Sequence, residues 1–141
     1  MAVEVNNLTR SFIDKNLLKK VAEKVLRGEN RQRDSLSIVL AGLKRMKDLN
    51  RKYRKESKPT DVLSFNFSEE LLMGELGEII ICPDLVKKNA ERYESTFKRE
   101  LVRVLIHGIL HLLGYNHKKP EEAQKMEKRQ NHYLSKLSPT V

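Results

Sequence analysis

Hydrophobic positions along the chain follow two rhythms: an alternation typical of strands and a spacing of three to four residues typical of helices. Alternating or short continuous apolar runs predict strands at residues 3–5, 36–40, 62–67 and 77–82. Apolar stripes at helical spacing predict helices at about residues 14–28, 43–49, 83–93, 95–113 and 120–137. This order predicts an α+β fold, with a small mixed four-stranded sheet packed with about five helices, rather than an all-parallel doubly wound fold.

Two of these segments have a distinctive pattern. The helix predicted at 95–113 is apolar on most sides, which is typical of a helix buried at the centre of a domain. In the strand predicted at 62–67, Ser64 and Asn66 point away from the side of Leu63 and Phe65. The first pattern predicts a central helix, and the second predicts a strand with one polar face.

The net charge narrows the candidate partners. The 141 residues include 28 Lys and Arg against 19 Asp and Glu, which gives a formal net charge of +9. Such a surplus attracts anions and makes nucleic acid a candidate partner. A length of 141 residues is ordinary for one domain, so we expect a single domain over residues 1–141.

Cysteine usage and the apolar runs indicate the compartment. Cys82 is the only cysteine, which excludes an internal disulfide and a Cys-rich zinc site. No apolar run reaches the ~20 residues of a membrane span, and residues 1–7 have neither the basic nor the apolar stretch of a secretion signal. We therefore expect a cytoplasmic protein with no disulfide partner and no membrane contact.

Three of the four histidines, His107, His111 and His117, fall within residues 107–117. His107 and His111 are four apart on a predicted helix, so both imidazoles leave the same face and can bind one metal. Gly114 permits a left-handed backbone that ends the helix and lets His117 return as a third ligand. Three neutral imidazoles leave a fourth position open, which is typical of a catalytic site with one zinc ion per chain. The alternative is histidines at an accidental spacing, an interpretation that we adopt for His132.

Other side chains near these histidines favour phosphate chemistry over peptide hydrolysis. Arg99 and Arg103 continue the four-residue spacing upstream, where they either bind substrate phosphate or are exposed or ion-paired. The residue after the first histidine is Gly108, whereas the long zinc-peptidase motif has a glutamate general base there. The usual glutamate route to peptide hydrolysis is therefore excluded, while a metal can still activate water or polarise a phosphoryl oxygen.

Two blocks of the sequence resemble the YbeY family of bacterial rRNA maturation factors. The first block is the histidine stretch at 107–117, and the second lies upstream, at 49–50, 53–54 and 59–65. Residues 76–81, between the two blocks, resemble a strand of the family. The similarity covers about residues 36–135. It implies a zincin-like α+β fold with a buried metal-binding helix. It also implies a metal-dependent, single-strand-specific endoribonuclease that acts in 16S rRNA 3′-end maturation and ribosome quality control.

The resemblance also implies residue roles. It makes His107, His111 and His117 the zinc ligands and Arg54 the functional arginine of the upstream block. A guanidinium can hold a phosphate through two hydrogen bonds and stabilise charge as the bond breaks. Without the resemblance, the sequence favours Arg54 as one more member of a basic surface run.

Two positions depart from the family pattern. Asn116 stands where the family usually has aspartate, so the turn can persist without a carboxylate. Ser57 occupies a position that is often acidic. The general base therefore stays open among a metal-activated water, a carboxylate such as Glu56 or Asp61, and the RNA 2′-hydroxyl.

The sequence thus predicts a zinc-dependent endoribonuclease that binds single-stranded RNA, with the small ribosomal subunit as partner. Tyr53 and Tyr115 are the aromatic residues nearest the motifs and could stack on bases, although Tyr115 could equally pack against the helix end. The alternative function is a non-catalytic ribosome- or RNA-binding module with a structural zinc. A divergent metallopeptidase is a third and weaker interpretation.

Overall fold

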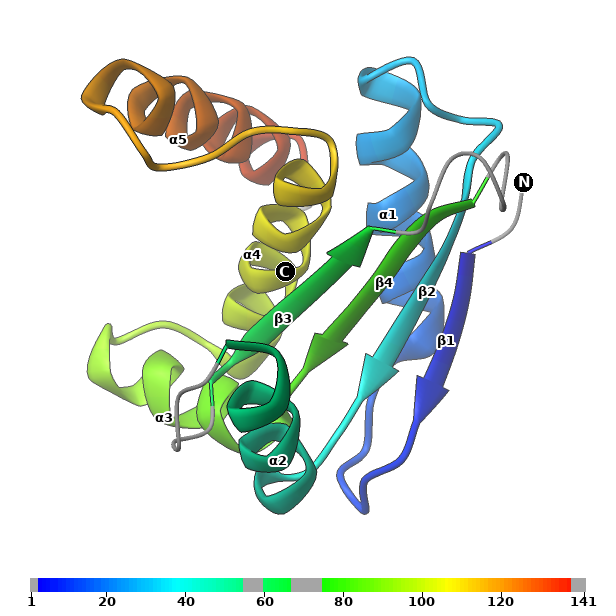
Figure 1. Ribbon diagram of the computed structural model, residues 1–141, viewed down its shortest axis with the longest axis vertical. Helices are drawn as coiled ribbons and strands as arrows, with labels where there is room; N and C mark the ends of the chain where they lie inside the picture. The colour runs from blue at the N-terminus through cyan, green and yellow to red at the C-terminus, as the bar shows by residue number, and fades with distance from the viewer. Residues whose placement is uncertain (1–2, 55–59, 67–74, 138–141) are drawn as a thin grey trace.

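The computed structural model describes residues 3–54, 60–66 and 75–137, and it contains a mixed sheet with helices on both faces (Figure 1). The strands are β1 (Val3–Asn7), β2 (Ser35–Leu40), β3 (Val62–Asn66) and β4 (Glu75–Ile81). The helices are α1 (Lys15–Gly28), α2 (Leu43–Arg54), α3 (Pro83–Arg92), α4 (Phe97–Leu112) and α5 (Pro120–Ser135). The predicted α+β class, with four strands and five helices in the described residues, is confirmed.

The strands lie in the order β1-β2-β4-β3. β1 and β2 are parallel, and so are β2 and β4, whereas β3 runs antiparallel to β4. A parallel pair needs a crossover connection, and α1 supplies it between β1 and β2. β3 therefore lies at one edge of the described sheet, where only one of its sides is paired.

The main core lies between the sheet and the helices α1 and α4. Ten of the 16 residues of α4 are buried, which confirms the predicted central helix. A smaller cluster covers the opposite face, where Met46 of α2 packs on Leu63 and Ile80 of the sheet and on Cys82. Figure 1 shows α2 in front of the sheet and α1 behind it.

The polar face of β3 is turned toward α4. Ser64 Oγ donates to the carbonyl oxygen of Gly108 at 3.3 Å, and Asn66 Nδ2 donates to that of Leu112 at 2.9 Å. Leu112 belongs to the last turn of α4, whose carbonyls have no partner within the helix. A Cβ on Gly108 would lie 3.1 Å from Ile79 Cγ2, so glycine allows α4 to approach the sheet closely. These contacts place the end of α4 beside the edge strand.

Glu29 connects α1 to the segment after α4 and to α5. Its carboxylate accepts hydrogen bonds from Tyr115 Oη at 2.8 Å, from Arg129 Nε at 3.2 Å and from Tyr133 Oη. A Cβ at Gly28 would meet the Tyr133 hydroxyl, so the small residue allows the ring to approach. Burial alone would raise the pKa of Glu29, but the hydrogen bonds from Tyr133, Arg129 and Tyr115 outweigh it and hold the pKa below 4.5. The carboxylate is therefore charged at neutral pH.

We expect Glu29→Gln to lower the free energy of unfolding at neutral pH by about 1–3 kcal/mol, because charged hydrogen bonds are lost in a mostly buried site. A depressed pKa stabilises the fold above the ordinary value and loses that contribution as the pH falls through the folded-state value. The difference from the wild type should therefore shrink below pH 4.5. Urea unfolding at neutral pH and at a pH below 4.5 measures the difference in unfolding free energy between the variant and the wild type. Glu23→Gln, at an exposed position of the same helix, is the control. An equal difference at both pH values would contradict this account.

Candidate functional site

The three predicted histidines converge at the end of α4. His107 and His111 project from its last turns, and Gly114 follows with a φ of +105°, which ends the helix as predicted. Asn116 Oδ1 then accepts a hydrogen bond from the backbone N–H of Lys118 at 2.9 Å. The predicted turn thus forms with asparagine, and it returns His117 to a position 5.0 Å from His107 between ring centroids.

His107 and His117 have the separation of two ligands on one ion. Their Nε2 atoms are 3.4 Å apart. Two nitrogens bound at tetrahedral angles to the same zinc lie about 3.3–3.4 Å apart. The chemistry and the spacing of this pair therefore fit a divalent ion.

His111 lies farther from this pair. The ring centroids of His107 and His111 are 6.4 Å apart, and the rings are nearly parallel at 7°. In the part of the chain that the structure describes, no three His, Cys, Asp or Glu side chains are already arranged to hold an ion. His111 is exposed, so a change of side-chain rotamer can turn its ring toward the pair. The set of three ligands stays a prediction.

Gln130 of α5 orients the ring of His107. Its Oε1 lies 3.0 Å from His107 Nδ1, and an amide oxygen only accepts, so Nδ1 carries the proton and Nε2 keeps its lone pair. Burial is the main cause that lowers the pKa of His107, the charges of His117 and Arg103 lower it further, and the Gln130 contact opposes them. His107 is therefore a neutral imidazole with its metal-binding nitrogen facing His117. The sequence carried no sign of Gln130, which lies 23 residues away.

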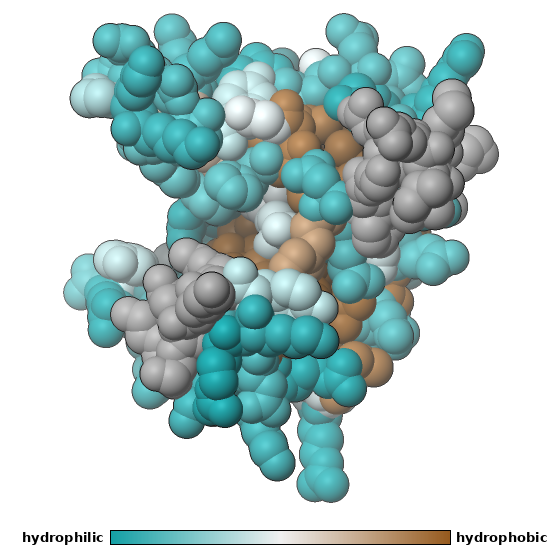
Figure 2. All heavy atoms as spheres, in the orientation of Figure 1, coloured by the Kyte–Doolittle hydropathy of each residue, from teal (hydrophilic) through white to brown (hydrophobic). Residues whose placement is uncertain are grey.

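The histidines border a pocket of about 470 Å³ beside the edge strand. Its walls come from the end of α2, from β3 and from the histidines, and the lining residues are Tyr53, Val62, Leu63, Ser64, Phe65, His107, His111 and His117. Figure 2 shows the surface hollowed at the left margin, between the regions of α5 and α3, where β3 forms the edge of the sheet. The site is thus open to a large substrate.

The predicted arginines are placed differently from one another. Arg103 donates to Glu100 from Nε at 2.9 Å and from Nη2 at 2.6 Å, and Glu100 is only 3% exposed. Arg99 is exposed, and neither it nor Arg103 is among the residues that line the histidine pocket. Arg54 is the last residue of α2, and its side chain lies outside the described part of the chain. Arg103 is therefore ion-paired with Glu100, and binding of substrate by Arg54, Arg99 and Arg103 stays a prediction.

Of the two carboxylates predicted as candidate bases, Glu56 and Asp61, the structure describes only Asp61. Glu56 lies outside the described residues, and so does Ser57, the position that is often acidic in the family. Asp61 Oδ2 accepts from Asn89 Nδ2 at 3.3 Å, which ties it to α3. Asp61 is not among the residues that line the histidine pocket. The structure therefore does not bring this carboxylate to the histidines.

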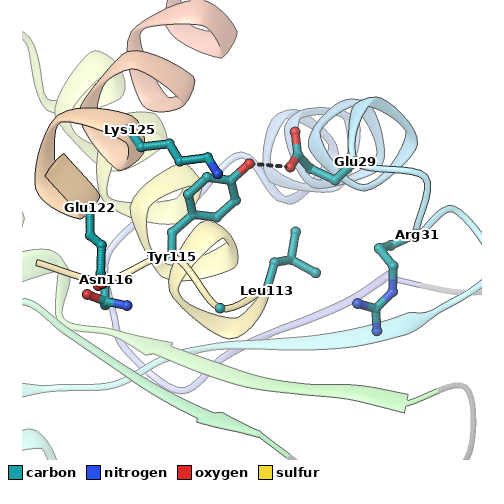
Figure 3. Close-up of a pocket in the computed structure, with 8 residues that line it drawn as sticks. Glu29, Arg31, Leu113, Tyr115, Asn116, Glu122 and Lys125 are labelled. Carbon is teal, nitrogen blue, oxygen red and sulfur yellow. Dashed lines mark hydrogen bonds between the residues drawn. The ribbon is translucent and has the colours of Figure 1, made fainter.

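Tyr115 lines a second pocket of about 390 Å³ (Figure 3) and is not among the residues that line the histidine pocket. Its hydroxyl donates to Glu29, and burial, followed by this hydrogen bond, raises its pKa. Tyr115 thus packs against the helix end, the more ordinary of its two predicted uses. Two cations and two acids line this pocket, namely Arg31, Lys125, Glu29 and Glu122. Their charges balance, so the pocket favours neither a negative nor a positive ligand.

Comparison with known proteins identifies the family. A family profile described as Endoribonuclease YbeY matches residues 4–138 of the chain. The chain belongs to the YbeY family. The resemblance that the two sequence blocks indicated is confirmed, and the match extends beyond residues 36–135 to almost the whole chain.

Individual relatives agree with this assignment. Endoribonuclease YbeY of Chlorobium luteolum is 37% identical over 138 residues, which cover 97% of this chain and 98% of the relative. Endoribonuclease YbeY of Thermodesulfovibrio yellowstonii is 48% identical over 107 residues, 74% of this chain and 67% of the relative. A solution structure of a Thermotoga maritima protein has 32% identity and a TM-score of 0.69, and the match covers 94% of this chain and 87% of that chain. The YbeY-family fold is therefore shared at the level of sequence and of structure.

No helix in the described residues has the length and apolar character needed to cross a membrane.

Proposed function

We propose that this YbeY-family chain is a metal-dependent endoribonuclease that cleaves single-stranded RNA. Its relatives are named endoribonucleases, and the observation that carries the proposal is the pair of Nε2 atoms 3.4 Å apart in an open pocket. His107, His111 and His117 hold one divalent ion, with zinc as the first candidate for an all-imidazole ligand set. Residues 1–141 act as one domain in the cytoplasm, on the 3′ end of 16S rRNA and in ribosome quality control.

The side chains of the site divide the work. A bound ion supplies Lewis-acid chemistry, which polarises a phosphoryl oxygen and acidifies water. Gln130 keeps the proton of His107 on Nδ1, so that Nε2 stays available as a ligand. Arg54 holds the scissile phosphate by two hydrogen bonds. Gly108 offers no base, and a Cβ there would lie 3.1 Å from Ile79 Cγ2 and 3.3 Å from Ser64 Oγ, so the close packing of α4 on the sheet favours glycine at this position.

The surface of α2 favours RNA. Its described side chains include five exposed cations and one acid, namely Lys44, Arg45, Lys47, Arg51, Lys52 and Asp48. The end of this helix lines the histidine pocket through Tyr53. The cations therefore attract the phosphate backbone toward the site, without reading its sequence and with a strong dependence on salt.

Removal of the metal tests the function directly. We expect the purified protein to cleave a single-stranded oligoribonucleotide, to lose the activity with a chelator, and to regain it with one equivalent of a divalent ion. The matched duplex and a peptide should stay intact. A 2′,3′-cyclic phosphate on the product would identify the ribose hydroxyl as nucleophile, whereas a 5′-phosphate with a 3′-hydroxyl would identify water. Cleavage of RNA that resists the chelator, or cleavage of the peptide alone, would contradict the proposal.

A further inference from the structure

Tyr53 is an exposed aromatic residue in the wall of the proposed active site. It is 55% exposed, whereas Met46 of the same helix is buried against the sheet. Among the large hydrophobic residues that the structure shows exposed, Tyr53 is the one that lines the histidine pocket; the others are Leu8, Phe12, Leu43 and Tyr93. An exposed ring at this place is available to a substrate.

Neighbouring side chains hold the ring in place. Tyr53 packs edge-to-face with Phe65 of β3, with 5.0 Å between the centroids and 65° between the planes. The Nζ atom of Lys52 lies 5.3 Å from the centre of the Tyr53 ring. Figure 1 shows α2 in front of the sheet, next to β3. A tyrosine restrained in this way loses little conformational entropy when a ligand covers it.

The chemistry of such a ring next to cations suits a nucleobase. A base stacks on an aromatic face regardless of its identity, while lysine and arginine next to the ring hold the phosphates on either side. Bases in a duplex are already stacked on their own neighbours, so only an unpaired base can cover the ring. A platform at this point therefore accounts for a preference for single strands without base-specific contacts.

We propose that one unpaired base of the RNA stacks on Tyr53, next to the phosphate that is cleaved at the histidine site. The inference rests on the proposed endoribonuclease function and adds a residue that selects single-stranded substrates. Tyr53 acts in binding, and the histidines act in the chemistry.

Substitution of the ring should change KM more than kcat. We expect Tyr53→Leu to raise KM for a single-stranded oligoribonucleotide by about 5- to 150-fold and to keep kcat within about threefold. Tyr53→Phe keeps the stacking face and should stay within about twofold of the wild type. Tyr93→Leu, at the end of α3, removes another exposed tyrosine and should have no effect. A KM of Tyr53→Leu equal to that of the wild type, or an equal rise in Tyr93→Leu, would overturn the proposal.

Substrates with a single abasic nucleotide locate the stacked base. Moved along the strand, the gap should raise KM of the wild type at one position near the cleaved bond, and Tyr53→Leu should no longer respond to that position. A variant that responds like the wild type at every position overturns the proposal. If Tyr53→Leu fails to fold, the series of abasic substrates still tests the proposal on the wild type. The proposal is overturned if no position of the abasic nucleotide raises the KM of the wild type. If the wild type cleaves no RNA, the endoribonuclease proposal fails, and binding of the same oligonucleotides measured by fluorescence anisotropy still tests the stacking.

Discussion

His111→Ala should leave the protein folded and remove both its metal and its RNA cleavage. His111 is exposed and makes no contribution to the buried core, so the melting temperature should change little. Loss of one of three ligands should weaken metal affinity by more than about 100-fold, because removal of a residue that only hydrogen-bonds to a ligand already weakens metal affinity by about 10–100-fold. Metal content by mass spectrometry, melting temperature and kcat/KM for single-stranded RNA measure the three effects.

The control for His111→Ala is His132→Ala, which removes an exposed histidine of α5. This variant should keep metal and activity. Gln130→Leu gives a graded comparison, because it leaves all three imidazoles and removes the acceptor of His107 Nδ1. It should weaken metal affinity by about 10–100-fold, and Gln130→Glu, which keeps an acceptor oxygen, should retain it.

Two results would contradict the roles assigned here. If His111→Ala keeps both metal and activity, His111 is not a ligand and the ion, if any, depends on His107 and His117. If the wild type shows no cleavage while His111→Ala loses thermal stability and RNA binding together, the protein is a non-catalytic RNA-binding module in which the metal is structural.

Local patterns in the sequence were sufficient for the elements of the fold. The apolar character of 95–113 predicted α4 as the central helix, and Ser64 and Asn66 marked the side of β3 that bonds to it. The ends of elements were less well predicted. The helix predicted to stop before Asn50 continues to Arg54, because Asn50 is fully buried in α2 and the tertiary contacts outweigh its weak helix propensity.

The strand predicted from residue 77 begins earlier for a similar reason. Glu75 pairs with Ser35 of β2 across a register shift, which extends β4 two residues before the predicted start at residue 77. Pairing with a neighbouring strand is a long-range property, so the residues before position 77 carry no local signal for it.

The distinction between local patterns and long-range contacts also separates the parts of the site that the sequence predicted from those that it missed. His107, His111 and His117 lie on one helix and the turn after it, so their spacing along the chain was informative. Gln130 reaches His107 only because α5 packs beside α4. The sequence also carried no sign that Arg103 pairs with Glu100, because the burial of Glu100 is visible only in the structure.

Arg54→Ala should retain the metal and lose most of the activity. Arg54 ends α2 directly after Tyr53, which lines the histidine pocket, so the helix brings position 54 to the border of the site. A guanidinium that stabilises charge developing on the phosphate contributes about 10²–10³-fold to kcat, and we expect a loss of that size. Arg54→Lys keeps the charge but not the paired hydrogen bonds, so its activity should fall between that of the wild type and that of Arg54→Ala. Metal content and kcat are measured on the same preparations.

Arg51→Ala is the matched control for Arg54→Ala, because Arg51 is an exposed arginine on the same helix, three positions earlier. Its loss removes one cation from the basic surface, which should raise KM a few-fold at low salt and have little effect at high salt. The effect of Arg54→Ala on kcat should persist at high salt, since a contact within the site is screened less. If both variants lose the same activity with the same salt dependence, Arg54 is one more cation of the α2 surface, and the charge of the reacting phosphate must be stabilised by other groups in the pocket.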